Sequence, residues 1–161
     1  TWQLERRGIN IKGGREMGLM TSTSVADVMS PRFSAVPLAL NITGVREKLL
    51  SAPHGELFVV GDNDRLCGTI TLSDLSDGAF DHALDGLVNA GDIARLHPPA
   101  LEASDNLDDA LKKMLTVGEE HLAVVENRET MKLVGFVHEI DVMLVYNRAL
   151  LEARREERGE I

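Results

Sequence analysis

Cysteine, tryptophan and tyrosine each occur only once in the 161-residue chain, and aromatic residues make up 4 % of it. Because Cys67 is the only thiol, neither an intrachain disulfide nor a cysteine-based metal cage can form, and a reducing compartment is expected. No run approaches the roughly 20 apolar residues of a membrane helix, and no signal peptide is visible. Since the chain starts at Thr1 rather than Met, we expect a fragment whose membrane segment lies upstream.

An excess of basic residues is also missing, because 17 Lys and Arg stand against 26 Asp and Glu. The net charge of −9 argues against nucleic-acid binding, which needs a basic face. Walker A, G-x-S-x-G, H-E-x-x-H and G-x-G-x-x-G patterns do not occur. His82 and Asp85 lie one helical turn apart, but two ligands on a linker are weak evidence for a metal site. We expect neither enzymatic activity nor a bound metal.

The chain does contain an internal repeat. GTITLSD at 68–74 recurs as GFVHEID at 135–141, and ELFVVGD at 56–62 recurs as HLAVVEN at 121–127. The valine pairs are separated by 65 residues and the glycines by 67, so the second copy carries two extra residues in a polar loop. The chain is therefore predicted to be a duplication.

Each copy is predicted to run strand, helix, strand, turn, strand, helix. The first copy has strands at 33–36, 57–60 and 66–71, and Asn41 is a candidate N-cap for its helix. In the second copy Ser104 or Asp105 is predicted to cap a helix over 107–117, and a long helix covers 139–157. Apolar runs such as LFVV indicate strands buried on both faces. The predicted class is α+β with two similar halves.

Both repeated phrases end a strand and open a helix, where free backbone N–H groups can bind a phosphate. Thr71 could add a hydroxyl donor and Asp74 could accept from a sugar diol; alternatively, Thr71 or Ser73 only caps the helix and Asp74 complements its dipole. In the second phrase His138 replaces the hydroxyl. A protonated imidazole would be a strong donor to phosphate, but His138 could instead only cap the helix, and Glu139 would repel a polyphosphate.

The opening V-x-D-V-M-S-P, the strand and hairpin, and G-h-h-T-x-x-D together resemble a CBS domain, named after cystathionine β-synthase. Two in tandem resemble a Bateman module, a regulatory pair that commonly binds adenosine nucleotides. The resemblance implies two β-α-β-β-α repeats packed with pseudo-twofold symmetry. It places a linker at 1–23, the first repeat at 24–80, a connector at 81–87, the second repeat at 88–147 and a helical extension at 148–161.

Two flanking stretches, QLERRGINIKGGRE (3–16) and GFVHEIDVMLVYNRALLEARREE (135–157), resemble the cytoplasmic tail of voltage-gated ClC-type chloride channels and transporters. That resemblance implies a homodimer on the cytoplasmic face of a membrane, attached to an upstream transport domain. The alternatives are a ligand-free dimerisation scaffold and a CBS pair of another host, such as a divalent-metal exporter or a nucleotide-metabolism enzyme.

The resemblance also implies a nucleotide site between the repeats for ATP, ADP or AMP, with no cofactor required. By position its residues are Asp141, His138, Ser34, Ala35, Val36, His54 and Gly55. His54 stands where an aromatic residue stacks on adenine in some family members, although an exposed loop histidine is an equally good interpretation. A second possible site would use Thr71, Asp74 and His97, but Glu119 and Glu120 there disfavour a phosphate.

Overall fold

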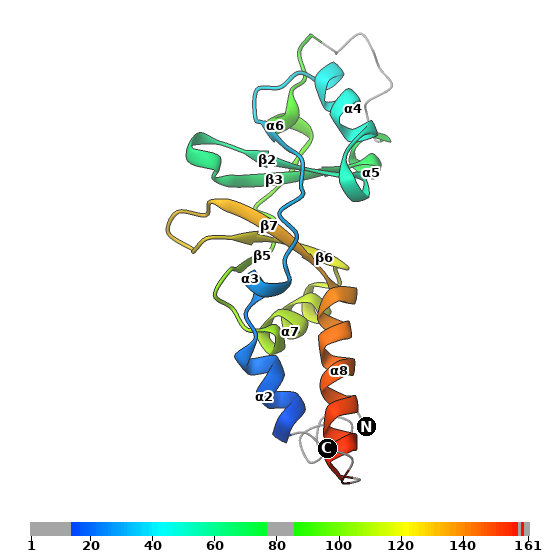
Figure 1. Cartoon of the computed structure of the whole chain (residues 1–161). Coiled ribbons are helices and arrows are strands. Elements are labelled where there is room, and N and C mark those ends of the chain that lie inside the picture. The colour runs from blue at the N-terminus through cyan, green and yellow to red at the C-terminus, as the bar shows by residue number, and fades with distance from the viewer. Residues whose placement is uncertain (1–13, 77–85, 158, 160–161) are drawn as a thin grey trace. The chain divides into compact units, whose positions relative to one another are not determined.

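A computed structural model describes residues 14–76, 86–157 and 159 (Figure 1). The predicted linker residues 1–13 and most of the connector, 81–85, which includes His82 and Asp85, lie outside the described residues. The chain divides into two compact units, and each is described by itself. Unit 1 is Thr1–Met29, Ala103–Leu122 and Val137–Ile161, and unit 2 is Ser30–Glu102 and Ala123–Phe136.

Unit 2 contains a four-stranded sheet in the order β1-β2-β3-β4. Its strands are β1 (Ala35–Pro37), β2 (Glu56–Val60), β3 (Leu66–Thr71) and β4 (Arg95–Leu96). β1 runs parallel to β2, whereas β2–β3 and β3–β4 are antiparallel. Asn63 and Asp64 both have positive φ, as a tight hairpin turn requires, and they join β2 to β3.

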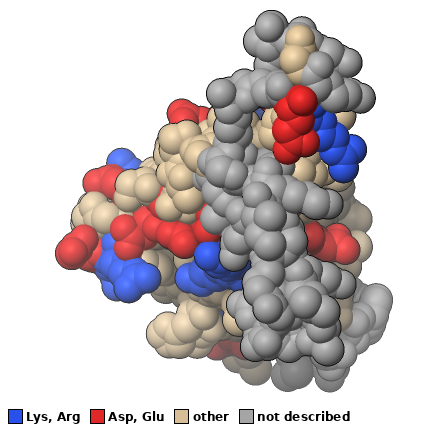
Figure 2. Space-filling model, turned by 90° about the horizontal axis from the view of Figure 1, so that it is seen from below, with Lys and Arg blue, Asp and Glu red and all other residues tan. Residues whose placement is uncertain are grey.

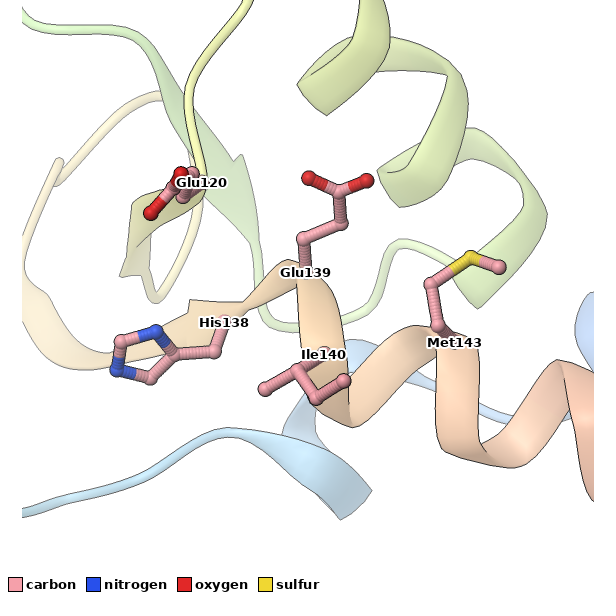
Figure 3. A pocket seen from close by; sticks show the side chains of 5 residues that line it. All are labelled: Glu120, His138, Glu139, Ile140 and Met143. Atoms are coloured by element: carbon pink, nitrogen blue, oxygen red, sulfur yellow. The ribbon is translucent and has the colours of Figure 1, made fainter.

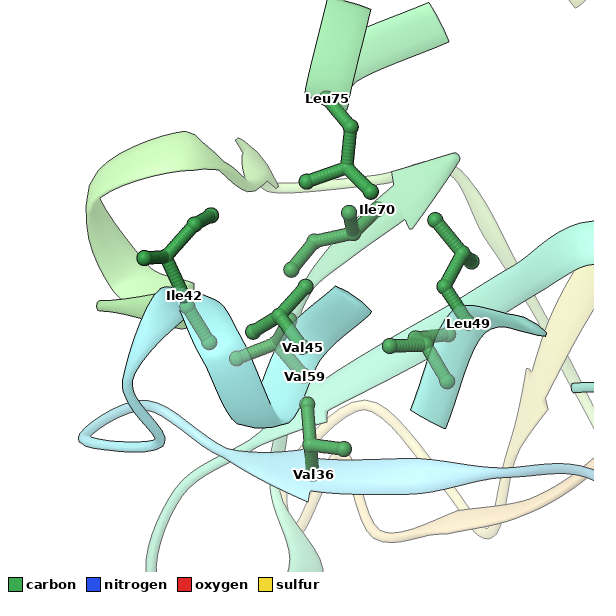
Figure 4. Packing of buried hydrophobic residues seen from close by; sticks show 9 residues of the cluster. Val36, Ile42, Val45, Leu49, Val59, Ile70 and Leu75 are labelled. Atoms are coloured by element: carbon green, nitrogen blue, oxygen red, sulfur yellow. The ribbon is translucent and has the colours of Figure 1, made fainter. Parts of the chain in front are cut away.

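One face of this sheet is covered by α4 (Ile42–Leu50), α5 (Leu72–Ser76) and α6 (Ala90–Ile93). Side chains alternate along a strand, so Leu57 and Val59 of β2 point to the same face and join Ile70 of β3 in one buried cluster. Figure 4 shows Val59 and Ile70 within this cluster. Each such buried side chain stabilises the fold by about 1.5–3 kcal/mol. The full cluster is Val36, Ile42, Val45, Leu49, Leu57, Val59, Ile70, Leu75 and Ala90.

The opposite face of the sheet packs on strands of the second repeat. Those strands are β5 (Ala100–Glu102), β6 (His121–Val125) and β7 (Leu133–His138), in the order β5-β6-β7. Phe58 and Leu66 form one buried cluster with Ala123, Val125, Leu133 and Phe136. The run LFVV is therefore buried on both faces of its sheet, as its composition predicts.

The strand registers of the two repeats are the same after a shift of 65 residues. Ala35 pairs with Phe58 in the first repeat, and Ala100 pairs with Ala123 in the second. Both pairs belong to parallel ladders of three residues, which confirms the predicted duplication at the level of backbone pairing.

Unit 1 is built from α2 (Gly14–Ser22), α3 (Val25–Val28), α7 (Leu107–Val117) and α8 (Glu139–Glu157). α2 lies beside α8 and also contacts α7 (Figure 1). Met20 of α2, Met114 of α7 and Ala149 of α8 are all buried. The described part of the predicted linker is thus largely helical and contributes a core residue.

Each repeat docks its first short helix on the other repeat. In unit 1 the N–H of Val25 donates to the carbonyl oxygen of Asp105, and in unit 2 that of Ala90 donates to Leu40, both at 2.7 Å. Every residue in the second bond differs by 65 from its counterpart in the first. The Ala26–Ala103 and Leu107–Thr23 bonds of unit 1 recur in the same way as the Gly91–Leu38 and Ile42–Val88 bonds of unit 2.

The helix caps confirm one prediction and correct another. The Asn41 side chain caps α4 by accepting from the N–H of Gly44 at 2.8 Å, as predicted. The cap of α7 is Asn106, which accepts from the N–H of Asp109 at 2.8 Å, so the prediction of Ser104 or Asp105 is wrong. The carbonyl of Asp105 instead accepts from Val25.

Smaller differences concern the ends of elements. β1 begins two residues later than predicted and includes Pro37, whereas the predicted ranges of β3, α7 and α8 agree with the structure. Among the described residues, no helix combines the length and the apolar character that crossing a membrane requires.

Candidate functional site

The first repeated phrase forms a junction between β3 and α5 in unit 2. Both the backbone N–H and the hydroxyl of Thr71 donate to Oδ2 of Asp74, at 2.8 and 3.1 Å. Asp74 lies in the first turn of α5, where a carboxylate also complements the helix dipole. Thr71 and Asp74 therefore bond to each other, which is the capping geometry rather than an outward-facing donor and acceptor.

A basic side chain from β4 approaches the same carboxylate. Nε of Arg95 lies 3.9 Å from Oδ2 of Asp74, whose side chain is 18 % exposed. His97 follows β4 with a positive φ of 56°, is exposed, and donates its N–H to the carbonyl oxygen of Cys67 at 3.2 Å. The structure thus brings Thr71, Asp74 and Arg95 together, and sequence reasoning had missed Arg95.

The second repeated phrase forms a junction between β7 and α8 in unit 1. The N–H of Glu139, the first residue of α8, donates to the carbonyl oxygen of Glu120 at 2.7 Å. The ring of His138 lies against that of His121 with 5.3 Å between centroids. Asp141 is half-buried in the first turn of α8.

A hollow of about 250 Å³ opens at this junction. Figure 3 shows the side chains that line it, with His138 at the end of β7 and the others around the start of α8 and on the segment before β6. The lining residues are Glu120, His138, Glu139, Ile140 and Met143. Of these, His138 was predicted for the site of Asp141. Glu120 was expected beside Thr71 and Asp74, and that expectation is wrong, because its carbonyl oxygen accepts from Glu139 at the second junction.

The remaining predicted residues lie in unit 2, around the starts of β1 and β2. The carbonyl oxygen of Ser34 accepts from the N–H of Phe58 at 2.9 Å. Ala35 is exposed and Val36 is buried; both line a hollow of about 510 Å³ with the chain after them and the β2–β3 turn. Its other lining residues are Pro37, Leu38, Ala39, Val60, Gly61, Asp62 and Asp64.

His54 and Gly55 immediately precede β2, and both have positive φ, 59° and 66°. The His54 side chain is exposed, and its ring stands edge-on to Phe136 with 5.3 Å between centroids. Phe136 belongs to β7 of the second repeat, so the candidate base-stacking residue already contacts that repeat within unit 2. Nothing in the residue pattern singled out Phe136 except its place inside the repeated phrase.

The predicted site residues therefore fall into two groups. Ser34, Ala35, Val36, His54 and Gly55 belong to unit 2, whereas His138 and Asp141 belong to unit 1. Among the described residues, no cluster of three or more His, Cys, Asp or Glu side chains is arranged to hold a metal ion.

Charged side chains of both signs are intermixed on the face drawn in Figure 2. Two ion pairs join side chains of opposite charge, with Lys112 Nζ 2.9 Å from Asp108 Oδ2 and Arg128 Nε 2.9 Å from Glu102 Oε1. In each pair the basic side chain is exposed and the acidic one half-buried, so each contributes only modestly to stability.

The fold and its two strand-to-helix junctions define a duplicated α+β module. The first short helix of each repeat, α3 or α6, packs on the other repeat. The family model described as CBS domain matches residues 25–79 and 90–148. The chain therefore belongs to the CBS domain family, as its repeated phrases predict. None of the curated proteins compared with the chain matches it.

Solved structures of CBS-containing proteins resemble this chain over most of its length. CBSX2, in complex with AMP, is 25 % identical with a TM-score of 0.61, and the match covers 83 % of this chain and 100 % of that one. The CBS domain of the bacterial CNNM/CorC family Mg²⁺ transporter, in complex with ATP, is 18 % identical with a TM-score of 0.67. That match covers 82 % of this chain and 92 % of the other.

The cytosolic domain of the Mg²⁺ channel MgtE, in complex with ATP, is 21 % identical with a TM-score of 0.63. This match covers 76 % of the chain but only 48 % of the MgtE domain, so the MgtE domain contains much that this chain does not.

Proposed function

We propose that this chain is a regulatory CBS pair that binds an adenine nucleotide through Asp141. The observation that carries the proposal is the difference between the two motif aspartates. Asp74 accepts the N–H and the hydroxyl of Thr71. His138 stands at the place of Thr71 and has no hydroxyl with which to repeat that second contact. The Asp141 carboxylate is therefore the better acceptor for the two hydroxyls of a ribose.

The other half of the proposed site is formed by residues 34–36 and 54–55. Positive φ at His54 and Gly55 turns the chain sharply just before β2 and leaves the imidazole exposed at its edge-on contact with Phe136. An exposed planar ring held by a second ring offers a face on which adenine can stack. Phe136 is two residues before His138, the last residue of β7.

The similar proteins support the chemical class of ligand. CBSX2 was solved with AMP, and the CNNM/CorC domain with ATP. For this chain the proposal assigns no catalytic step. The ligand would act by binding one arrangement of the module more tightly than another, because only a difference in affinity can shift such an equilibrium.

Titration calorimetry with AMP, ADP and ATP tests the proposal. Asp141→Ala is expected to weaken binding at least about tenfold, since it removes a charged hydrogen-bond acceptor. Asp74→Ala is the matched control, because it removes the equivalent carboxylate of the first repeat and should leave the affinity unchanged. Saturable binding that Asp141→Ala does not affect would contradict the site.

The absence of binding tighter than millimolar for all three nucleotides would favour the rival function, a ligand-free dimerisation scaffold. A homodimer is part of both hypotheses, so sedimentation analysis of the oligomeric state cannot replace the titration.

We propose that the host protein is a ClC-type chloride channel or transporter. The module would lie on the cytoplasmic face of the membrane, where nucleotide binding would modulate gating. The support is the phrasing of residues 3–16 and 135–157. MgtE and the CNNM/CorC protein make other membrane hosts, including a divalent-metal exporter, the main alternative. The sequence upstream of Thr1 would distinguish these hosts. A ClC-type host requires membrane helices there, whereas a nucleotide-metabolism enzyme would have a catalytic domain.

A further inference from the structure

We infer that the outward face of α8 is the surface on which two copies of this chain pair, with their two α8 helices antiparallel. Three large apolar side chains of α8 are exposed, Ile140 by 63 %, Leu144 by 56 % and Leu151 by 58 %. Because an α-helix turns by about 100° per residue, these three and the exposed Asn147 lie within about 60° of one another around the helix. These four residues are called the outer stripe. Pairing there would form the homodimer expected from the sequence and needs no bound nucleotide.

The opposite side of α8 is already covered within unit 1. Val142, Ala149 and Ala153 lie about half a turn away from the outer stripe and are buried, at 0, 3 and 7 % exposure. A helix that packs on one side only is expected to have one apolar stripe and a polar opposite face. Single exposed leucines are common on protein surfaces, but an apolar stripe on the second side of a packed helix indicates an interaction surface.

The spacing of the outer stripe makes it complementary to a second copy of itself. Its members, Ile140, Leu144, Asn147 and Leu151, follow one another at intervals of four, three and four residues, which are the intervals between d and a positions of a coiled coil. When two such helices run antiparallel, Ile140 faces Leu151 of the second copy and Leu144 faces Asn147. Every member of the stripe then has a partner in the stripe of the other copy.

The hollow at the start of α8 adds a complementary shape. It has a volume of about 250 Å³, and Ile140 and Met143 supply its apolar lining (Figure 3). In the antiparallel alignment the exposed Leu151 of the second copy lies opposite Ile140, at the edge of this hollow. One end of the stripe thus offers a recess and the other end offers a protruding leucine.

Charges beside the stripe favour the antiparallel orientation. Asp141 and Arg148 each follow a stripe residue and therefore flank the same side of the seam. In an antiparallel pair Asp141 of one copy lies near Arg148 of the other, and this contact occurs twice by symmetry. A parallel pair lacks it, because each flank then faces the opposite flank of its partner. A carboxylate has two acceptor oxygens, so this ion pair and a ribose hydroxyl can share Asp141.

The seam is short, about 17 Å from Ile140 to Leu151. Stable interfaces bury about 800 Å² on each partner, so a single seam of this length predicts a dimer with a dissociation constant in the micromolar range. Analytical ultracentrifugation of the whole chain over about 1–300 μM measures this equilibrium.

The variant Leu144→Gln/Leu151→Gln is expected to raise the dissociation constant at least about hundredfold, because two leucines of each copy lose their apolar contacts. Leu50→Gln/Leu72→Gln is the matched control, since it replaces two leucines of unit 2 that are 84 and 59 % exposed. The control should dimerise like the unmodified protein. Circular dichroism should show both variants folded, because all four side chains are exposed.

Disulfide cross-linking in a Cys67→Ser background tests the orientation. A mixture of Ile140→Cys and Leu151→Cys chains should form a cross-linked pair on oxidation, because these positions face each other. Neither variant alone should cross-link, since like positions lie about 16 Å apart along an antiparallel pair and a disulfide spans at most about 7 Å between Cα atoms. Efficient cross-linking of Ile140→Cys chains with one another would contradict the antiparallel pairing.

A dimer that resists Leu144→Gln/Leu151→Gln, or that only Leu50→Gln/Leu72→Gln dissociates, would overturn this surface and leave the expected homodimer intact. A chain that stays monomeric over the whole concentration range would overturn both. Binding of a monomeric chain to anionic vesicles, lost in Leu144→Gln/Leu151→Gln, would show instead that a membrane covers the stripe. The nucleotide titrations decide the proposed function separately, so its failure is distinguishable from each of these results.

Discussion

The backbone N–H of Val25 donates to the carbonyl oxygen of Asp105 at 2.7 Å, and this bond joins the first repeat to the second. Its counterpart 65 residues on, from Ala90 to Leu40, joins the second repeat to the first at the same distance. Val25 and Ala90 are both fully buried. Each repeat thus completes the packing of the other, and neither is expected to be stable by itself.

Because α3 packs on the second repeat, a mutation in α3 is predicted to destabilise that repeat. Val25→Ala removes two buried methyl groups and should lower the free energy of unfolding by about 2 kcal/mol. The loss of amide protection measured by hydrogen exchange should appear in α7, which belongs to the other repeat, rather than in α4. Loss confined to α4 would contradict this packing.

The reciprocal substitution serves as the control for that experiment. Ala90→Gly in α6 should destabilise by about 1 kcal/mol, because glycine is a poor helix former. Its loss of protection should appear in α4, since Ala90 donates to Leu40 just before that helix.

The two asparagine caps predict a matched pair of stability effects. Asn41→Ala and Asn106→Ala each remove a side chain that accepts a backbone N–H at 2.8 Å. Each should lower the free energy of unfolding by about 1 kcal/mol in urea titrations. Asn147→Ala, at an exposed interior position of α8, should change stability little or raise it slightly. Equal effects at all three positions would contradict the cap assignment.

Two glycines are predicted to respond to alanine in opposite directions. A Cβ on Gly68 would lie 2.9 Å from the carbonyl oxygen of Arg95 and 3.0 Å from Cβ of Ala94, so Gly68→Ala should destabilise by about 1–3 kcal/mol. A Cβ on Gly18 in α2 would meet nothing within 4 Å. Gly18→Ala should therefore stabilise the helix by about 0.5–1 kcal/mol. Thermal unfolding of the two variants beside the unmodified protein measures both signs.

Asp74 and Asp141 are predicted to separate stability from binding. Asp74→Ala removes the acceptor of two hydrogen bonds from Thr71 and should lower the free energy of unfolding by about 1–2 kcal/mol. Asp141→Ala should change ligand affinity more than stability. Urea titrations without nucleotide check the first expectation, and the reverse order of the two stabilities would contradict it.

The elements that follow local periodicity were predictable from the sequence. The ranges of β3, α7 and α8 agree because apolar spacing and turn residues determine them locally. Asn106 was also within reach, since it stands 65 residues after the correctly predicted Asn41. Ser104 and Asp105 were predicted because Ser and Asp are favoured at N-caps. Alignment of the two repeats would have indicated Asn106 instead.

Features that depend on distant partners were not predictable. The bond from Val25 to Asp105 and the ring contact of His54 with Phe136 each join segments about 80 residues apart, and no local pattern specifies them. The helix α2 was missed because GGREMG contains three glycines, which disfavour a helix unless tertiary contacts stabilise it. The closed Thr71–Asp74 pair shows that one repeated phrase can cap a helix while the other remains a candidate for binding.

Mapping the amide shifts of the isotope-labelled protein during a titration with AMP tests the central claim most directly. We predict saturable changes that are largest at residues 34–36, 54–55 and 138–141, and that vanish in the Asp141→Ala variant. Changes centred on Thr71 and Asp74, or no saturable change at any amide, would contradict the claim that this CBS pair binds an adenine nucleotide through Asp141.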